Sequence, residues 1–387
     1  MENLNMQVDM EHLMAELKKA KEIMGVSDED FESFTKLLDD PQALLDLLSN
    51  SGIYTFHDYF YYPFRMETDK ADPDFVRAVL TFKDGTVKRT RRSRFESEVK
   101  LKISAAKLLF NLAEKCFKEG KPIPTAPLVD DADMETYINI NRAFKHMFHN
   151  IFLDSGVSIE ELARKAGRSV EQVEQLRSFS SDVNLDEMVR LLACLGVGTN
   201  LTCCVEDSRK MYSYTDYVMY DAECIPDPDG TGAELKLMVN NSRAKPKLHV
   251  FFNQHDHAER YKEAVTNWAQ RLILEGKRVP DGNSGRSNRR ANLSVRLDVH
   301  TALKIMFHNV MLDTGKDLSG LGEEVGLPAQ LLLLLLQDLS HKDDFSLLYQ
   351  AFDEAGGGLH FSCSRFDAEH NPEDAEAAEL LYKTFVD

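Results

Sequence analysis

A duplicated segment is the feature that most constrains the fold of this chain. The stretch AFKHMFHNIFLDSG at 143–156 recurs as ALKIMFHNVMLDTG at 302–315, so that His308 follows His149 by 159 residues. Three shorter matches occur in the same order, pairing 53–59 with 211–217, 119–124 with 275–280, and 201–203 with 361–363. Self-similarity at a fixed spacing is the signature of a repeated structural unit. The sequence therefore predicts two diverged copies, A and B, of one unit.

The first half of each copy is predicted to form strands. Aromatic and β-branched residues, which favour strands, cluster in three runs per copy: 53–64, 76–82 and 86–92 in copy A, and 212–220, 235–239 and 247–252 in copy B. In copy A, Asp84-Gly85 separates the second and third runs, which predicts a β-hairpin. Copy B has Asn240-Asn241 at this place, a looser form of the same signal.

An amphipathic helix is predicted after the strands of each copy. Apolar residues recur at helical spacing before Gly120 and before Gly276, and glycine commonly ends a helix. Short polar linkers are expected next, at 125–135 and 281–292.

The second half of copy A has the pattern of a helical bundle. A first helix is expected over 140–153. Ser158 is the expected N-cap of a second helix that ends at Gly167, and Ser169 is the expected N-cap of a third. Apolar spacing over 185–192 predicts a fourth helix that closes the bundle.

This pattern resembles the helix-turn-helix domain of the Xre/phage-repressor family through four residues: Leu162, Ala163, Gly167 and Val173. The resemblance implies that 169–177 is the recognition helix. The whole unit resembles the HicB family of antitoxins, in which a small β-β-β-α domain precedes a helix-turn-helix. That likeness rests on three segments, 120–124, 157–167 and 302–309. It implies neutralisation of a small basic ribonuclease toxin and autoregulation at operator DNA.

We therefore expect an α+β fold with two copies of a small β-β-β-α domain, each followed by a helix-turn-helix bundle, and an extra N-terminal helical segment. The predicted boundaries are 1–50 for the acidic N-terminal segment, 51–130 and 131–205 for the two parts of copy A, 206–285 and 286–363 for those of copy B, and 364–387 for an acidic tail.

The net charge of −18 is unevenly distributed along the chain. Residues 1–50 hold 12 acidic and 4 basic side chains, and residues 364–387 hold 7 and 2, so the remaining body carries −18 + 13 = −5. The total charge alone therefore does not exclude nucleic acid. The most basic stretch, 83–102, includes Lys88, Arg89, Arg91, Arg92 and Arg94. It indicates a contact with nucleic acid or an acidic partner, docking of an acidic terminus, or an edge strand protected by charge.

Copy A is the candidate for binding duplex DNA. The residues predicted to contact phosphates or bases are Arg164, Lys165, Arg168, Ser169, Gln172 and Arg177. Glu171 and Glu174 on the same helix oppose the electrostatic attraction that phosphates require. The alternative is that these helices serve packing or dimerisation.

Copy B carries leucines at the matching positions: Leu331, Leu333, Leu334 and Leu336. A helix that is apolar on all sides must be covered. This predicts a buried protein interface, either a homodimer or docking of the N-terminal helices. A thicker internal core is the alternative, and in each case copy B is not expected to bind DNA.

No motif for catalysis, metal or cofactor binding is evident. The sequence lacks a P-loop, a dinucleotide fingerprint, Gly-x-Ser-x-Gly and His-Glu-x-x-His. His255-Asp256-His257 has no obvious third ligand, and the six cysteines form no Cys-x-x-Cys pair. With no apolar run of membrane-spanning length and no secretory signal, we expect a cytoplasmic protein without a membrane partner.

The sequence thus predicts a non-enzymatic, HicB-like antitoxin or transcription regulator. Its expected partners are a second copy of itself, a small basic toxin-like protein, and duplex DNA bound through copy A. The alternative is a protein-binding adaptor or self-associating scaffold whose helix-turn-helix folds no longer bind DNA.

Overall fold

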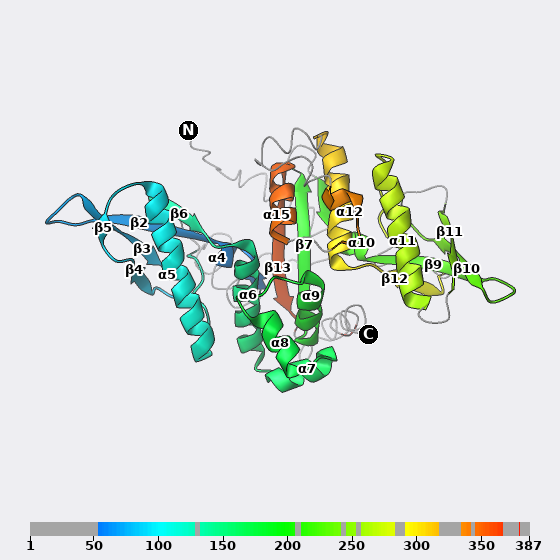
Figure 1. Ribbon diagram of the computed structural model, residues 1–387, viewed down its shortest axis with the longest axis horizontal. Helices are drawn as coiled ribbons and strands as arrows, with labels where there is room; N and C mark the ends of the chain where they lie inside the picture. The colour runs from blue at the N-terminus through cyan, green and yellow to red at the C-terminus, as the bar shows by residue number, and fades with distance from the viewer. Residues whose placement is uncertain are drawn as a thin grey trace, which may run out of the picture. The chain divides into compact units, whose positions relative to one another are not determined.

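The computed structural model describes residues 53–127, 132–205, 210–240, 245–252, 257–282, 291–316, 334–341, 345–366 and 379. Within these residues the protein is a mixed α+β fold with three sheets (Figure 1). The expected N-terminal helical segment and most of the acidic tail lie outside the described residues. None of the described helices combines the length and apolar composition needed to cross a membrane.

The copy A sheet has the strand order β4-β3-β2-β6, with β5 also paired to β3. Its strands are β2 (Tyr61–Thr68), β3 (Phe75–Thr81), β4 (Val87–Arg89), β5 (Ser93–Arg94) and β6 (Met134–Tyr137). Helix α5 (Glu98–Glu119) packs on β3 and β6 and ends at Gly120, as predicted. The Asp-Gly hairpin is confirmed: Gly85 has φ 77° and the carboxylate of Asp84 accepts from the Thr86 amide at 2.8 Å.

The copy B sheet repeats this element order as β11-β10-β9-β12. Its elements are β9 (Met219–Pro226), β10 (Gly232–Leu237), β11 (Lys247–Phe251), α11 (His257–Leu274) and β12 (Leu293–Arg296). The predicted pairing across Asn240 is confirmed, because β10 and β11 are antiparallel neighbours. Strands β6 and β12 were not predicted: β6 begins within the expected linker 125–135, and β12 follows directly after the expected linker 281–292.

The two aromatic runs are each broken by a short helix, where one continuous strand was predicted. In copy A, α4 (His57–Phe60) separates β1 (Ile53–Thr55) from β2. In copy B, α10 (Thr215–Val218) separates β8 (Lys210–Ser213) from β9. The helical turn buries the rings of Tyr59 and Tyr217 in the core. As a result, the two halves of each run belong to different sheets.

A central sheet with the order β1-β13-β7-β8 joins the two copies (Figure 1). Strands β7 (Val197–Val205) and β13 (Gly357–Arg365) close copies A and B, and they pair antiparallel over nine residues each. Leu201 pairs with Phe361 at the centre of the ladder. The opening strand of each copy pairs with the closing strand of the other, so the copies exchange strands. The sequence did not predict this sheet.

The remaining helices are α6 (Ile140–Ser155), α7 (Ile159–Ala166), α8 (Val170–Arg177), α9 (Leu185–Cys194), α12 (Val299–Thr314) and α15 (Phe345–Glu354). Helices α9, α12 and α15 contact the central sheet, α7 and α8 pack on α9 and α6, respectively, and several of the predicted helix ends are confirmed. Ser158 caps α7, Gly167 lies at φ 62° between α7 and α8, and Ser169 caps α8.

Helices are exchanged in the same way as strands. Helix α9 of copy A contacts α12 of copy B, and α15 of copy B contacts α6 of copy A. The carboxylate of Asp186 on α9 accepts from the Val299 amide at the start of α12, at 2.5 Å. Phe144 on α6 lies against Phe345 and Phe361, with ring centroids 6.0 and 4.8 Å apart. The copies therefore share one continuous hydrophobic core.

Candidate functional site

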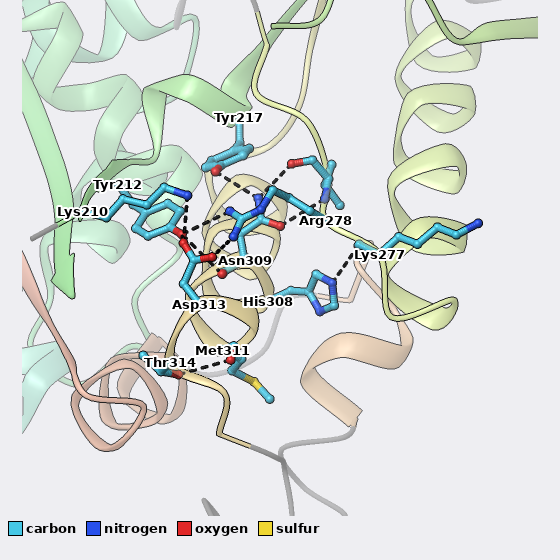
Figure 2. Close-up of polar contacts among 11 residues, drawn as sticks. Lys210, Tyr212, Tyr217, Lys277, Arg278, His308, Asn309, Met311, Asp313 and Thr314 are labelled. Atoms are coloured by element: carbon cyan, nitrogen blue, oxygen red, sulfur yellow. Dashed lines mark hydrogen bonds and ion pairs between the residues drawn. The ribbon is translucent and has the colours of Figure 1, made fainter. Parts of the chain in front are cut away.

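The repeated asparagine joins three parts of each copy. In copy B, the Asn309 amide nitrogen donates to the Tyr217 hydroxyl at 3.0 Å and to the Val279 carbonyl at 2.9 Å (Figure 2). Its oxygen accepts from the Val279 amide at 3.1 Å. Asn150 makes the same three bonds in copy A, at 2.7 to 3.2 Å. Both side chains are buried, so their role is to satisfy an irregular backbone segment.

The repeated histidines hold the same segment. Nε2 of His149 and of His308 each lie 2.9 Å from a carbonyl oxygen, that of Lys121 and that of Lys277. Because a carbonyl only accepts, Nε2 must carry the hydrogen. Burial lowers the pKa of both histidines, which keeps them neutral. These contacts support the packing role expected from their repetition.

A repeated lysine anchors the helix that carries these residues. Lys304 donates to the carbonyls of Asp338 and His341, each at 2.8 Å. Lys145 makes matching bonds to the loop after α8, including one of 2.5 Å to the Ser178 carbonyl. Burial lowers the pKa of Lys145 to about 8. Each amine thus ties the long helix of its copy to the loop that precedes the final helix.

A fourth contact holds the exchanged strand of each copy. Asp313 on α12 accepts from the Tyr212 hydroxyl and the Arg278 guanidinium, and lies 2.8 Å from the Lys210 ammonium (Figure 2). Lys210 and Tyr212 belong to β8, which pairs with β7 of copy A. The cluster therefore attaches β8 to its own copy while the strand pairs with the other.

Copy A has a simpler version of this contact. The Tyr54 hydroxyl on β1 donates to Asp154 at 2.6 Å, and Arg365 of copy B donates to the Asp154 carbonyl at 3.1 Å. Pro122 stands where copy B has Arg278. Sequence reasoning missed these Tyr–Asp pairs, although all four residues lie inside the repeated motifs.

The described residues contain no group of three or more His, Cys, Asp or Glu side chains that could hold a metal ion. His255 and Asp256 lie outside those residues, and His257 stacks on Phe252 with ring centroids 4.1 Å apart. Burial raises the pKa of Cys194 to about 11 and that of Cys203 to about 12. These thiols are therefore protonated near neutral pH and poor nucleophiles.

Two of the predicted DNA-contacting cations of copy A, Arg168 and Lys165, are paired with carboxylates. Arg168 forms two hydrogen bonds with the Glu187 carboxylate, at 2.7 and 3.1 Å, and this contact raises the pKa of Arg168. Lys165 pairs with Glu161 at 3.3 Å. Arg164 is exposed.

The other three predicted residues are used within the helices. Ser169 and Gln172 cap α8 reciprocally, with Gln172 Oε1 accepting from the Ser169 amide at 2.9 Å. The Arg177 guanidinium lies over the Phe152 ring, 3.9 Å from its centroid, and burial lowers its pKa. Of the six residues, Arg168 and Gln172 line the same cleft. The cleft has a volume of about 490 Å³ and is also lined by Glu187 and Asp182.

The basic hairpin lies at the edge of the copy A sheet. Three of its arginines face carboxylates of the neighbouring β2–β3 hairpin: Arg89 with Glu67 at 3.5 Å, Arg94 with Asp74 at 3.2 Å, and Arg92 with Asp69. Lys88 and Arg91 are exposed. Strand β4 ends at Arg89, so the strand predicted to continue to Arg92 is shorter than expected. These contacts favour the charged edge strand among the three interpretations.

The leucines of copy B are divided between surface and core. Leu331 and Leu333 lie outside the described residues. Leu334 is 54% exposed, whereas Leu336 is 5% exposed and its carbonyl accepts from the Gln270 side chain at 2.6 Å. Packing within the chain accounts for Leu336, in line with the alternative of a thicker core.

Comparison with known protein families finds no matching family model, and comparison with curated proteins finds no match. The function of this chain is therefore inferred from its own contacts. Those contacts use most of the polar groups singled out by the repeat to hold the parts of each copy together.

Proposed function

We propose that the protein is a non-enzymatic regulator that acts by binding another protein, built as a duplicated HicB-like unit with a helix-turn-helix over α6–α9. The pairing of β7 with β13 supports the two-copy part of this proposal, because matching strands of the two copies meet antiparallel about their centres. Self-complementary pairing of this kind is how two-fold dimers are built. The chain would thus contain, within itself, the dimer interface of a two-copy regulator.

The arrangement of α7 and α8 supports a protein partner over DNA. Phosphate contacts need available cations, but Arg168 and Lys165 are paired with carboxylates and Arg177 is packed on a ring. Glu171 and Glu174 are exposed on α8. We therefore assign α7 and α8 a packing or protein-binding role. Observed binding of duplex DNA would replace this assignment.

The test is affinity purification of the tagged full chain from its own cells, with and without nuclease. A stoichiometric protein that is recovered equally in both samples supports the proposal. Specific DNA fragments recovered without such a protein would identify a DNA-binding regulator. Arg164→Glu is the matched variant, since it should reduce recovery of DNA; loss of a recovered protein would instead place its binding site on α7.

The oligomeric state is tested separately, because a homodimer was expected from the sequence. If the two copies already supply the interface to each other, the chain should be a monomer of 44.0 kDa in light scattering. A mass twice that value would restore the homodimer, and Leu334, which is 54% exposed, would be the first residue to replace with a charge.

A further inference from the structure

Helix α5 carries two apolar stripes. The first faces the copy A sheet and core and consists of buried residues: Leu101, Ala105, Leu109, Ala113 and Cys116. The second, which we name the α5 stripe, recurs at i, i+4, i+7 and i+11: Val99, Ile103, Ala106 and Phe110. This spacing places the stripe on one side of the helix, away from the first. Packing on the sheet therefore does not explain it.

The α5 stripe is open to solvent over its first two turns. Val99 is 64% exposed and Ile103 is 49% exposed. Phe110, at the far end, is half-buried under the guanidinium of Arg142, which lies 4.0 Å from its ring centroid. The exposed part begins beside Phe95, which is 42% exposed just before the helix.

The matching helix of copy B has no such stripe. Aligning Gly120 with Gly276 places the buried Leu109 opposite the buried Val265, so the two helices share a register. In that register, the residues that replace Ile103, Ala106 and Phe110 are Glu259, Lys262 and Thr266. The common fold therefore does not require apolar residues at these positions, and copy A must carry them for another reason.

The charges around the α5 stripe also differ from those of copy B. Residues 99–111 contain Lys100, Lys102 and Lys107 and no carboxylate, while Glu96 and Glu98 precede them and Glu96 pairs with Lys100. Lysines in the N-terminal half of a helix oppose its macrodipole, which favours carboxylates there. Helix stability thus does not account for Lys102 and Lys107, whereas Lys100 is held by its ion pair with Glu96 one turn earlier. Copy B has Glu263 in place of Lys107.

We propose that the α5 stripe is the docking surface for an acidic amphipathic helix of a partner protein. The apolar face of that helix would cover Val99 and Ile103, and its flanking carboxylates would approach Lys102 and Lys107, which lie on opposite sides of the stripe. Anchors at i, i+4 and i+7 are the spacing by which helices dock. Aliphatic side chains neither stack on bases nor hydrogen-bond to them, which disfavours nucleic acid. This inference rests on the proposed protein-binding function and specifies the charge of the partner.

The probe is a labelled helical peptide of about four turns, with leucines along one face and glutamates elsewhere, and binding to the full chain is followed by fluorescence anisotropy. A peptide with lysines in place of the glutamates is the charge control. We expect the acidic peptide to bind and the basic one not to bind. Ile103→Glu should weaken binding of the acidic peptide by at least about tenfold.

Leu274→Glu is the matched control variant, because Leu274 is 66% exposed at the end of the corresponding helix α11. It should leave the affinity for the acidic peptide unchanged. Failure of the acidic peptide to bind would overturn the proposal. An equal loss of affinity for this peptide in Ile103→Glu and Leu274→Glu would do the same. So would binding of a single-stranded oligonucleotide or an anionic vesicle that Ile103→Glu abolishes, or carbodiimide cross-links from Lys102 and Lys107 to carboxylates of the acidic segments 1–50 or 364–387 of the same chain.

Failure of this inference and failure of the proposed function give different results. If a cellular protein is captured equally by the wild type and by Ile103→Glu, the protein-binding function stands and its site lies elsewhere. If the acidic peptide binds as expected but no cellular protein is captured, the surface stands and the proposed function fails.

Discussion

Asn150 and Asn309 each satisfy both the amide and the carbonyl of a residue that belongs to no strand or helix. In each copy these bonds connect the centre of the long helix, α6 or α12, to Ile123 or Val279. They also connect it to a tyrosine on the short helix α4 or α10 of the same copy. A buried backbone group without a partner is costly. This explains, in physical terms, why the His-Asn pair recurs in both copies without implying catalysis.

Asn309→Ala should lower the free energy of unfolding by about 2–6 kcal/mol, because it leaves the Val279 amide and carbonyl without a partner, at about 1–3 kcal/mol each. The measurement is urea denaturation followed by circular dichroism. Asn111→Ala, at an exposed position of α5, is the control and should change stability by no more than about 0.5 kcal/mol. Equal effects of the two substitutions would refute the assigned role.

His146 offers a pH-dependent test at the residue scale. It is buried, neither ring nitrogen has a partner among the described residues, and burial lowers its pKa from 6.5 to about 3. The unfolded state therefore binds more protons below pH 6.5, and stability falls as the pH falls from there toward 3. Copy B has the buried Ile305 at this position.

His146→Ile should therefore stabilise the chain more in acid than at neutral pH. One pKa unit corresponds to about 1.4 kcal/mol, so the gain should be about 2 kcal/mol larger at about pH 5 than at about pH 7.5. Unfolding by urea at both pH values measures this difference. A gain that is independent of pH would show that the imidazole is not buried in its neutral form.

At the scale of elements, local signals predicted the helices and missed the central sheet. Caps and apolar spacing placed α6 to α9 because such signals act over a few residues. The pairing of Leu201 with Phe361 joins strands far apart in the sequence, and no local pattern specifies it. At the candidate site, sequence identified Arg168 but could not supply its partner Glu187, which belongs to another helix. The leucine run likewise has no period that distinguishes the buried Leu336 from the exposed Leu334.

The attachment of β8 through Asp313 is testable at this scale. Asp313→Asn weakens the ion pairs with Lys210 and Arg278 and should release the strand from α12. We expect amide exchange in Met211–Ser213 to become about tenfold faster, as for a loss of about 1.4 kcal/mol in a local opening. Asp154→Asn should act on the opposite edge, at Tyr54, and leave β8 protected. Unchanged protection of β8 would mean that its pairing with β7 alone holds it.

At the scale of the whole molecule, exchanged strands and helices make each copy depend on the other. Helix α15 closes the core of copy A as well as its own, through contacts such as that of Phe345 with Phe144. A core shared in this way should unfold as one cooperative unit rather than as two domains in sequence. The single tryptophan, Trp268, lies in α11 of copy B and reports on that copy alone.

Phe144→Ala in copy A should therefore shift the unfolding transition seen by Trp268 in copy B. Phe144 is fully buried against α15 and β13, and truncating such a side chain costs about 3–5 kcal/mol. The fluorescence midpoint in urea should fall together with the midpoint from far-UV circular dichroism. Ala106→Ser, at a half-buried position of α5, is the control and should move neither. A Trp268 transition that stays in place while circular dichroism shows an earlier phase would mean that the copies unfold independently, and the central sheet would then not be the interface that unites them.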